Sequence, residues 1–524
     1  MKKALVLLLA VLMVLPLFAA CTSGNSNAPE TSANTGDPIE STPTVTDVPT
    51  TGGAPESSGE ETTLPADTEP AGPSGVSSVP VKELNHDVRV LSHSGSWQSY
   101  DIIGYEDVNL VDRENANIAN AIEIRNDRVS DSYKVTFTNV KDPNLVQSIR
   151  RSSARNTHEY DIVLPNIPEA GELSQLGLLI PIQDLPYCET DQPWYNQRAL
   201  SDLAIMGNNF FFFSDITLVN LDAIWVYFFN NEVVEKYQLD SPYTALAAGE
   251  WTLDTMLEMC EIVTDKDVDN MTKDNHWGLA GHDFNVTAFY VGSGEKIASS
   301  NAAGDIKLTM NTTRITDVIE ASLKFRPYWI RYPLYSSQYV SDFPGADERY
   351  GFVAGDNYPE IVASFTGEHT LFMGEVLDTL RELSNYDINS GVLPVPKLNS
   401  TQTEHYSTTT NNATATAVPT TTPDTELISI IIEAWAYESH KTLIPVYKEN
   451  CMKGVYSQDL VTPEVLEEVF NSASYDMGIY YNWGELAARY RAMVYSGSSD
   501  FTSLYRGYGE VAETAIKDFV KKYS

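Results

Sequence analysis

The sequence predicts an α/β fold in which helices cover both faces of a mostly parallel β-sheet. Near its start, the folded part alternates apolar, β-prone runs with runs of helical periodicity. Such alternation is typical of parallel sheets, because each crossover returns to the same edge. About 440 residues from Leu84 onward have ordinary globular composition. That length exceeds what one compact core supports, so we expect two lobes.

The first predicted elements follow this alternation. Residues 88–91 form a β-prone run, and residues 118–133 repeat apolar side chains on one helical face before a second strand begins at Val135. A second helix starts near Pro143, because proline suits a first helical turn. Residues 161–164 form a third short strand.

Two predicted loops lie at the carboxyl ends of these strands, where ligands meet parallel sheets. They cover residues 92–97 and residues 165–166, and they supply Ser94, Trp97 and Asn166 as candidate ligand contacts. Trp97 is the best candidate for stacking on a ligand, and a structural cap is the alternative for its ring.

Two later apolar runs end in polar residues that we expect to face a ligand. Residues 210–213 are four consecutive phenylalanines, which suit a strand in the middle of a sheet, and Asp215 follows where the chain crosses between lobes. Plain core packing is the alternative for these phenylalanines. Residues 370–373 form another buried strand, with Gly374 and Glu375 at its carboxyl end.

The first 20 residues have the features of an export signal. Lys2 and Lys3 precede an apolar run over residues 4–18, and small side chains come directly before Cys21. This resembles a bacterial lipoprotein signal, in which the cysteine receives a diacylglycerol with palmitate-like chains. Two acyl chains hold a protein firmly, so the resemblance implies a lipid anchor on the extracellular face of a Gram-positive-type cell membrane. An ordinary secretory signal is the alternative.

Residues 21–83 are predicted to be a disordered linker. Ser, Thr, Pro, Gly and Ala dominate the segment, and no Lys or Arg occurs between Lys3 and Lys82. Such a chain buries too little apolar surface to offset its ordering entropy. As a flexible coil it spans about 45 Å. We expect it to act as a tether, and a disordered regulatory tail is the alternative.

Charge and cysteine content exclude some partners. The formal net charge of −38 at pH 7 repels nucleic acid and anionic lipid headgroups, so we expect no nucleic-acid partner. Besides Cys21, the chain has Cys188, Cys260 and Cys451. They lie far apart without metal-binding spacing, so we expect buried thiols and at most one disulfide.

Several stretches in a fixed order resemble the extracellular solute-binding lipoproteins of ABC transporters, in particular the carbohydrate-type, family 1-like proteins of clostridia. They include IEIRNDRVSDSYKV, EYDIVLP, QPWYNQRAL, ASFTGEHTLFMGEV and IIEAWAYES. The resemblance implies a periplasmic-binding-protein-like, type II fold, with two lobes that are each a sheet flanked by helices and hinge strands between them. It also implies a monomer that captures a solute by hinge closure and delivers it to ABC permease subunits. The expected lobes are residues 84–213 with 368–410, and residues 214–367 with 411–524.

A sugar is the solute that the residue types favour. Sugar sites need flat aromatic platforms and hydrogen-bonding carboxylates and amides, and the chain has 29 Tyr, 18 Phe and 8 Trp. We expect the polar loop after Trp277 to face the ligand. Four other tryptophans are expected in the core or in packing between the lobes: Trp194, Trp251, Trp435 and Trp483. The candidate ligand-binding residues are Ser94, Trp97, Asn166, Asp215, His282, Asp283, Gly374 and Glu375. A site for peptides or polyamines is the alternative.

An acidic stretch over residues 265–276 partly follows the spacing of a calcium loop. Carboxylates stand at its first, third and fifth positions, but His276 occupies the twelfth, where such loops use glutamate. The candidate calcium ligands are Asp265, Asp267, Asp269 and Asp274. A solvated acidic turn is the alternative, and we expect no required cofactor.

We expect a binding protein rather than an enzyme, but two other functions stay open. His158 begins a zincin-like HEYDI motif that lacks a second histidine, and neither a nucleophile elbow nor a phosphate-binding loop occurs. Carboxylates are abundant, so a surface-anchored glycoside hydrolase is one alternative. A purely adhesive surface protein is the other.

Overall fold

The computed structural model describes residues 77–93, 113–266, 274–301, 304–332, 357–456 and 463–523. All of these belong to one compact unit, Glu69–Ser524. The predicted signal, Cys21 and the linker up to residue 76 lie outside the described residues. None of the helices in the described part of the chain is long and apolar enough to span a membrane.

The first sheet, β2-β1-β3, has three parallel strands. β1 (His86–Ser92) lies between β2 (Val135–Lys141) and β3 (Ile162–Leu164), and α1 (Arg113–Tyr133) and α2 (Leu145–Arg155) make the connections. The predicted alternation of strands and helices is therefore confirmed. The central strand is buried over its second half, which agrees with its apolar sequence.

The second sheet has five strands in the order β11-β5-β10-β6-β9. They are β5 (Trp225–Asn230), β6 (Trp277–His282), β9 (Trp329–Tyr332), β10 (Thr370–Val376) and β11 (Ser390–Leu393). β10 is parallel to β6, and β6 is parallel to β9, whereas β5 is antiparallel to its neighbours β10 and β11. The start of β5 therefore lies at the edge where β6, β9 and β10 end.

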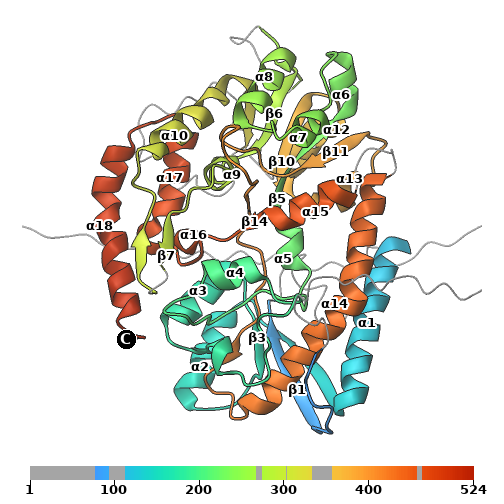
Figure 1. The fold of residues 1–524 in the computed structure, drawn as a ribbon, viewed down its shortest axis with the longest axis vertical. Coiled ribbons are helices and arrows are strands. Elements are labelled where there is room, and N and C mark those ends of the chain that lie inside the picture. Colours follow the sequence, from blue (N-terminus) through green and yellow to red (C-terminus); the bar gives the residue numbers. More distant parts are fainter. Residues whose placement is uncertain are drawn as a thin grey trace, which may run out of the picture. The chain divides into compact units, whose positions relative to one another are not determined.

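A long helix, α14 (Thr425–Tyr456), packs along α1 beside the first sheet, and Figure 1 shows the two running side by side. β13 (Val418–Pro419), which precedes α14, pairs with β4 (Leu179–Ile180). The other short elements of residues 165–205 are α3 (Ile167–Gln175), a 3-10 turn (Ile182–Asp184) and α4 (Gln197–Asp202).

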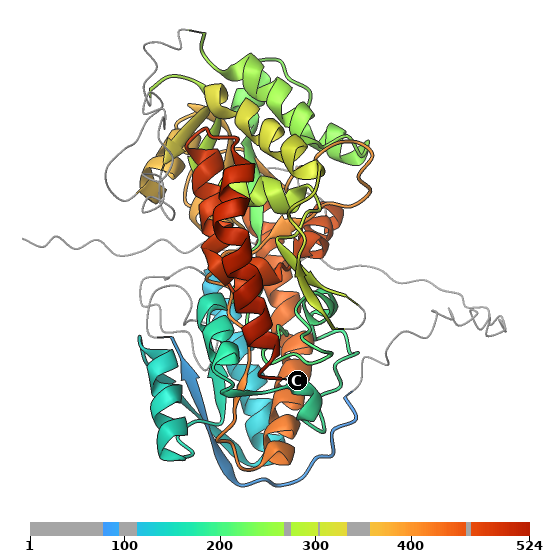
Figure 2. The same ribbon diagram turned by 90° about the vertical axis from the view of Figure 1, so that its left-hand side faces the viewer.

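Helices from distant parts of the sequence pack on the second sheet. They are α6 (Asn231–Lys236), α8 (Leu253–Val263), α9 (Phe284–Gly292) and α12 (Asn357–Thr366). α17 (Leu486–Tyr495) packs between α9, α10 (Arg314–Lys324) and α18 (Phe501–Val520), and Figure 2 shows α17 and α18 as neighbouring red helices. The remaining elements are α5 (Val219–Asp222), α7 (Pro242–Ala247), α13 (Thr379–Leu383), α15 (Pro463–Ser472), α16 (Met477–Tyr480), β7 (Ala298–Ser300), β8 (Ile306–Leu308), β12 (Ser407–Thr408), β14 (Ala473–Ser474) and two 3-10 turns (Arg326–Tyr328, Trp483–Glu485).

Two chain segments connect the sheets. Residues 214–224 lead into β5, and residues 394–412 lead away from β11 toward the first sheet. Ile224 forms a β-bridge with Thr409, and the Thr410 N–H donates to the carbonyl of Ala223 at 2.9 Å. The two connections therefore lie side by side, as hinge strands between two lobes do.

The predicted domain boundaries differ from the structure in three places. β10 and β11 join the second sheet, so residues 370–393 go with β5 and β6 and not with the first lobe. Residues 418–456 go with the first sheet, because β13 pairs with β4 and α14 packs on α1. Residues 77–83, predicted as linker, lie within the compact unit. Apolar runs predict strands, but they do not say which sheet a strand joins.

The four phenylalanines at residues 210–213 do not form the regular strand that we predicted. Phe212 makes an isolated bridge to Thr416. Aromatic rings from a distant segment take the place of strand neighbours: Tyr480 stacks 6.5 Å from Phe211, and Tyr475 lies 5.2 Å from Phe213. All four phenylalanines are buried, so the alternative prediction of core packing is confirmed.

The four tryptophans predicted in the core, Trp194, Trp251, Trp435 and Trp483, are all buried. The thiols of Cys188, Cys260 and Cys451 are unpaired. Cys260 is fully buried, whereas Cys188 and Cys451 are half-buried, so the prediction of buried thiols is confirmed only for Cys260. Burial also raises the pKa of Cys451 to about 12, which makes its thiol a poor nucleophile.

Candidate functional site

The carboxyl edge of the second sheet carries a cluster of polar side chains. His282 is the last residue of β6, and Glu375 is the penultimate residue of β10. Because these strands are parallel and Ala280 pairs with Met373, the two side chains reach the same edge. His282 Nε2 lies 3.4 Å from Glu375 Oε1, and His282 Nδ1 lies 3.5 Å from Asp283 Oδ1.

Arg491 completes this edge cluster, which we define as Trp225, His282, Asp283, Glu375 and Arg491. Its guanidinium comes from α17, and its Nε lies 3.1 Å from Asp283 Oδ2. The indole of Trp225 meets the His282 ring edge-on at 5.1 Å. Three strands (β5, β6 and β10), the loop that joins β6 to α9, and the helix α17 thus supply one site.

The edge cluster is buried. His282 is 3 % exposed and Glu375 is 4 % exposed. Burial alone would lower the pKa of His282, but hydrogen bonding to Asp283 and Glu375, together with their charges, outweighs it and raises that pKa to about 9. The raised pKa favours the imidazolium form at neutral pH. Nε2 faces Glu375, while Nδ1 also lies 3.1 Å from the Phe284 N–H, which can donate to it only when Nδ1 is unprotonated.

Gly374 supports the cluster by leaving space. A Cβ at this position would overlap Asn285 Oδ1. That oxygen accepts a hydrogen bond from the Tyr227 hydroxyl at 2.6 Å, while Asn285 Nδ2 donates to the carbonyl of His282 at 3.1 Å. Gly374 thus leaves room for Asn285 to link the end of β6 to β5.

The carboxyl edge of the first sheet is described only in part. Asn166 caps α3: its side chain accepts from the Glu169 N–H, and Glu169 accepts from the Asn166 N–H, both at 3.1 Å. Ser92 donates to Asn139 Oδ1 at 2.7 Å. The capping role explains the position of Asn166 without a ligand. The predicted contacts Ser94 and Trp97 lie outside the described residues.

Asp215 lies on the first connection between the sheets and not in the edge cluster. It accepts a hydrogen bond from His440 Nδ1 at 2.6 Å. Burial raises its pKa, and the hydrogen bond from His440 opposes that rise. Seven residues later along the same connection, Asp222 accepts from the Tyr447 hydroxyl at 2.7 Å and pairs with Arg381 at 2.9 Å. These contacts hold the connection to α14.

The structure therefore brings together His282, Asp283, Gly374 and Glu375, and it leaves Asn166 and Asp215 elsewhere. Sequence reasoning missed Arg491 and Trp225. Arg491 lies more than a hundred residues beyond β10 in a helix whose pattern gives no hint of a site, and Trp225 opens an apolar run that predicts only core.

Comparisons with known proteins agree on the fold. No protein-family model and no curated protein matches the sequence. Among solved structures, a sugar transporter from Rhizobium etli in an open conformation is 12% identical with a TM-score of 0.53, over 82% of this chain and 99% of its own. The sugar-binding protein MalE from Xanthomonas citri is 11% identical with a TM-score of 0.52, over 83% and 98%. The chain has a periplasmic-binding-protein-like fold.

A third structure with this periplasmic-binding-protein-like fold is the cyclic α-maltosyl-1,6-maltose binding protein from Arthrobacter globiformis. It is 13% identical with a TM-score of 0.50, over 83% of this chain and 99% of its own. At identities of 11–13%, the similarity to these structures shows the fold of this chain and does not identify its ligand. In open α/β sheets, ligands bind outside the carboxyl ends of the strands, which is where the edge cluster lies.

The calcium hypothesis gains no geometric support. Asp265 accepts hydrogen bonds from Asn275 Nδ2 and from the His276 N–H, both at 3.0 Å. Asp267 and Asp269 lie outside the described residues. Within the described ranges, no group of three or more His, Cys, Asp or Glu side chains is arranged to hold a metal ion.

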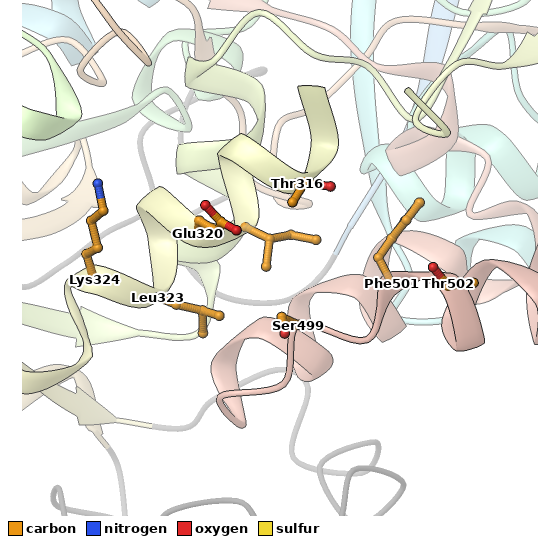
Figure 3. Close-up of a pocket in the computed structure, with 8 residues that line it drawn as sticks. Thr316, Glu320, Leu323, Lys324, Ser499, Phe501 and Thr502 are labelled. Carbon is orange, nitrogen blue, oxygen red and sulfur yellow. The ribbon is translucent and has the colours of Figure 1, made fainter. Parts of the chain in front are cut away.

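A cavity of about 520 Å³ lies away from the edge cluster, between α10 and the start of α18 (Figure 3). Its apolar lining comes from Ile319, Leu323 and Phe501. Lys324 also lines the cavity, and its Nζ lies 3.8 Å from Asp254 Oδ1. Thr316, Glu320, Ser499 and Thr502 line the cavity too, and we do not assign it a ligand.

Proposed function

We propose that the protein binds a sugar or an oligosaccharide at the edge cluster and releases it unchanged. The observation that carries this proposal is the buried grouping of His282 with Glu375 and of Arg491 with Asp283 at the carboxyl edge of the second sheet. The fold supports it, because the neighbours described above are named as sugar-transport or sugar-binding proteins.

The chemistry of the cluster suits hydroxyl groups. Carboxylates of Asp283 and Glu375 accept from sugar hydroxyls, while His282 and Arg491 donate to them. The separation of 3.4 Å between His282 Nε2 and Glu375 Oε1 is long for a hydrogen bond. Glu375 Oε1 can therefore accept a shorter hydrogen bond from a sugar hydroxyl. Trp225 supplies an aromatic wall beside these groups.

The wider role that we propose is capture for an ABC importer. Solute favours a closed arrangement, because only there do both lobes touch it. The closed protein then docks on permease subunits in the membrane. The proposal includes a lipid anchor at Cys21, an extracellular location and a monomer. The lipoprotein-like signal and the resemblance to solute-binding lipoproteins support these points.

A ligand screen tests the proposal. The chain from residue 22 onward is heated with monosaccharides, linear and cyclic glucans, peptides or polyamines, and each mixture is then examined by mass spectrometry. We expect a rise in melting temperature with one class of sugar, because a ligand that binds only the native state stabilises it. The sugar is expected back intact. A shift with peptides alone, or cleaved sugar, contradicts the proposal.

A further inference from the structure

The segment just before β1, residues 77–84, packs on the first sheet's helices. Val79 is 8 % exposed and belongs to an apolar cluster with Val129 and Tyr133 of α1. Val81, two residues later, is 72 % exposed. One side of this segment is therefore buried and the other faces solvent.

Polar contacts fasten both ends of the same segment. The Leu84 N–H donates to the carbonyl of Tyr133 at 2.7 Å, at the end of α1. Lys82 pairs with Glu426 at the start of α14, with Nζ 2.8 Å from Oε1. Ser78 donates to the carboxylate of Glu189, in the loop after β4. Figure 2 shows the blue chain before β1 beside α14.

These contacts join three pieces that are distant in sequence: the end of α1, the start of α14 and the loop at Glu189. A small cavity of about 150 Å³ lies beneath the segment, between Val129 of α1 and Ala434 of α14. Beside it, Arg128 of α1 pairs with Glu438 of α14 at 3.1 Å. The segment thus crosses the groove where the two long helices meet.

The charges fit this placement. Lys82 is the first basic residue after Lys3, and it meets an acidic residue at the start of α14. The pair is exposed, and exposed pairs stabilise little. The buried Val79 and the Leu84 hydrogen bond therefore provide most of the attachment. The Lys82–Glu426 pair orients the segment toward the start of α14.

We propose that residues 77–84 are a strap that fixes where the N-terminal segment leaves the domain. The strap places this exit on the α1–α14 side of the first sheet. A pull from a membrane anchor, which rests on the proposed function above, then acts on the first sheet and its helices. The second sheet and its edge cluster stay free to move with the ligand.

A pair of matched variants tests the strap without ligand or lipid. Val79→Asp places a charge in the buried site, and Val81→Asp places the same charge two residues away in solvent. The chain from residue 22 onward is digested briefly with a broad-specificity protease, and the N-terminus of the resistant fragment is read by mass spectrometry. Amide exchange at Leu84 is followed in parallel.

We expect the wild type and Val81→Asp to give a resistant fragment that begins at or before Ser78, with slow exchange at Leu84. Val79→Asp is expected to give a fragment that begins beyond Leu84, with exchange at least tenfold faster. If Val79→Asp does not fold, Val79→Ala replaces it, because it removes the buried side chain without adding a charge, and it is expected to shift the cleavage in the same direction. Identical fragments and exchange in all variants would overturn the strap. Because no ligand is used, a failed sugar screen leaves this result interpretable.

Discussion

Tyr195 donates its hydroxyl proton to Glu433 Oε2 at 2.6 Å in a site where neither residue is exposed. The Trp194 indole donates to Glu433 Oε1 at 3.0 Å, and the Glu189 N–H donates to Oε2 at 3.1 Å. Burial raises the pKa of Glu433 to about 7, although the hydrogen bonds lower it. Glu433 thus fastens this loop to α14 and titrates near neutral pH.

The first prediction concerns pH and Glu433. Its pKa in the folded state lies above the ordinary value of 4.5, so its contribution to stability is fully present below that pH and is lost as pH rises through about 7. Between about pH 5 and pH 8, the wild type should lose about 2.5 kcal/mol more unfolding free energy than Glu433→Gln. Urea unfolding at several pH values measures this, and parallel pH profiles would refute it.

The second prediction concerns His282, whose pKa is raised to about 9. Its contribution is present below the ordinary value of 6.5 and is lost as pH rises through about 9. The stability difference between the wild type and His282→Gln should therefore shrink by about 3 kcal/mol between neutral and strongly alkaline pH. Chemical unfolding of both proteins checks this. A difference that stays constant with pH would mean that the imidazole is neutral in the fold.

Local patterns predicted the first sheet well. The run at residues 88–91 and the helical face of residues 118–133 appear as β1 and α1, because the spacing of apolar residues within each segment already marks the face that it buries. The phenylalanine run at 210–213 failed as a strand for the opposite reason. Its aromatic neighbours are Tyr475 and Tyr480, and the local sequence does not predict contacts with residues so distant in the chain.

The candidate site divides in the same way. His282 and Glu375 follow apolar strands, so their place at strand ends could be predicted from the chain alone. Arg491 could not, because its partner Asp283 is distant in sequence and its helix has an ordinary pattern. Asn166 also follows a strand, but its side chain caps α3. A position at a strand end thus predicts that a residue lies near the carboxyl edge of a sheet. The hydrogen-bond partner of its side chain then determines whether that residue belongs to the candidate site or caps a helix.

The third prediction tests the space at Gly374. Gly374→Ala should destabilise the protein by about 1–3 kcal/mol, because the added Cβ would overlap Asn285 Oδ1 in a packed sheet. Gly507→Ala is the control, since a Cβ there meets nothing within 4 Å on α18. Alanine in a helix interior should stabilise by up to about 1 kcal/mol. Thermal unfolding of both variants measures these changes. Equal shifts in melting temperature would show that β10 can accommodate a Cβ in place of Gly374.

The last prediction separates binding from folding at Glu375. Glu375→Gln removes the charge next to His282 while it keeps the size of the side chain, so a bound hydroxyl loses a charge-assisted hydrogen bond. Such bonds contribute about 1.5–3 kcal/mol, which corresponds to a roughly tenfold to hundredfold weaker Kd for the sugar found by the screen. Glu368→Gln is the matched control, because Glu368 is exposed just before β10, at the opposite edge of the same strand. Calorimetric titration should show normal binding for the control and weak binding for Glu375→Gln. Equal affinity in both variants would move the sugar site away from the edge cluster, even if the protein still binds sugars.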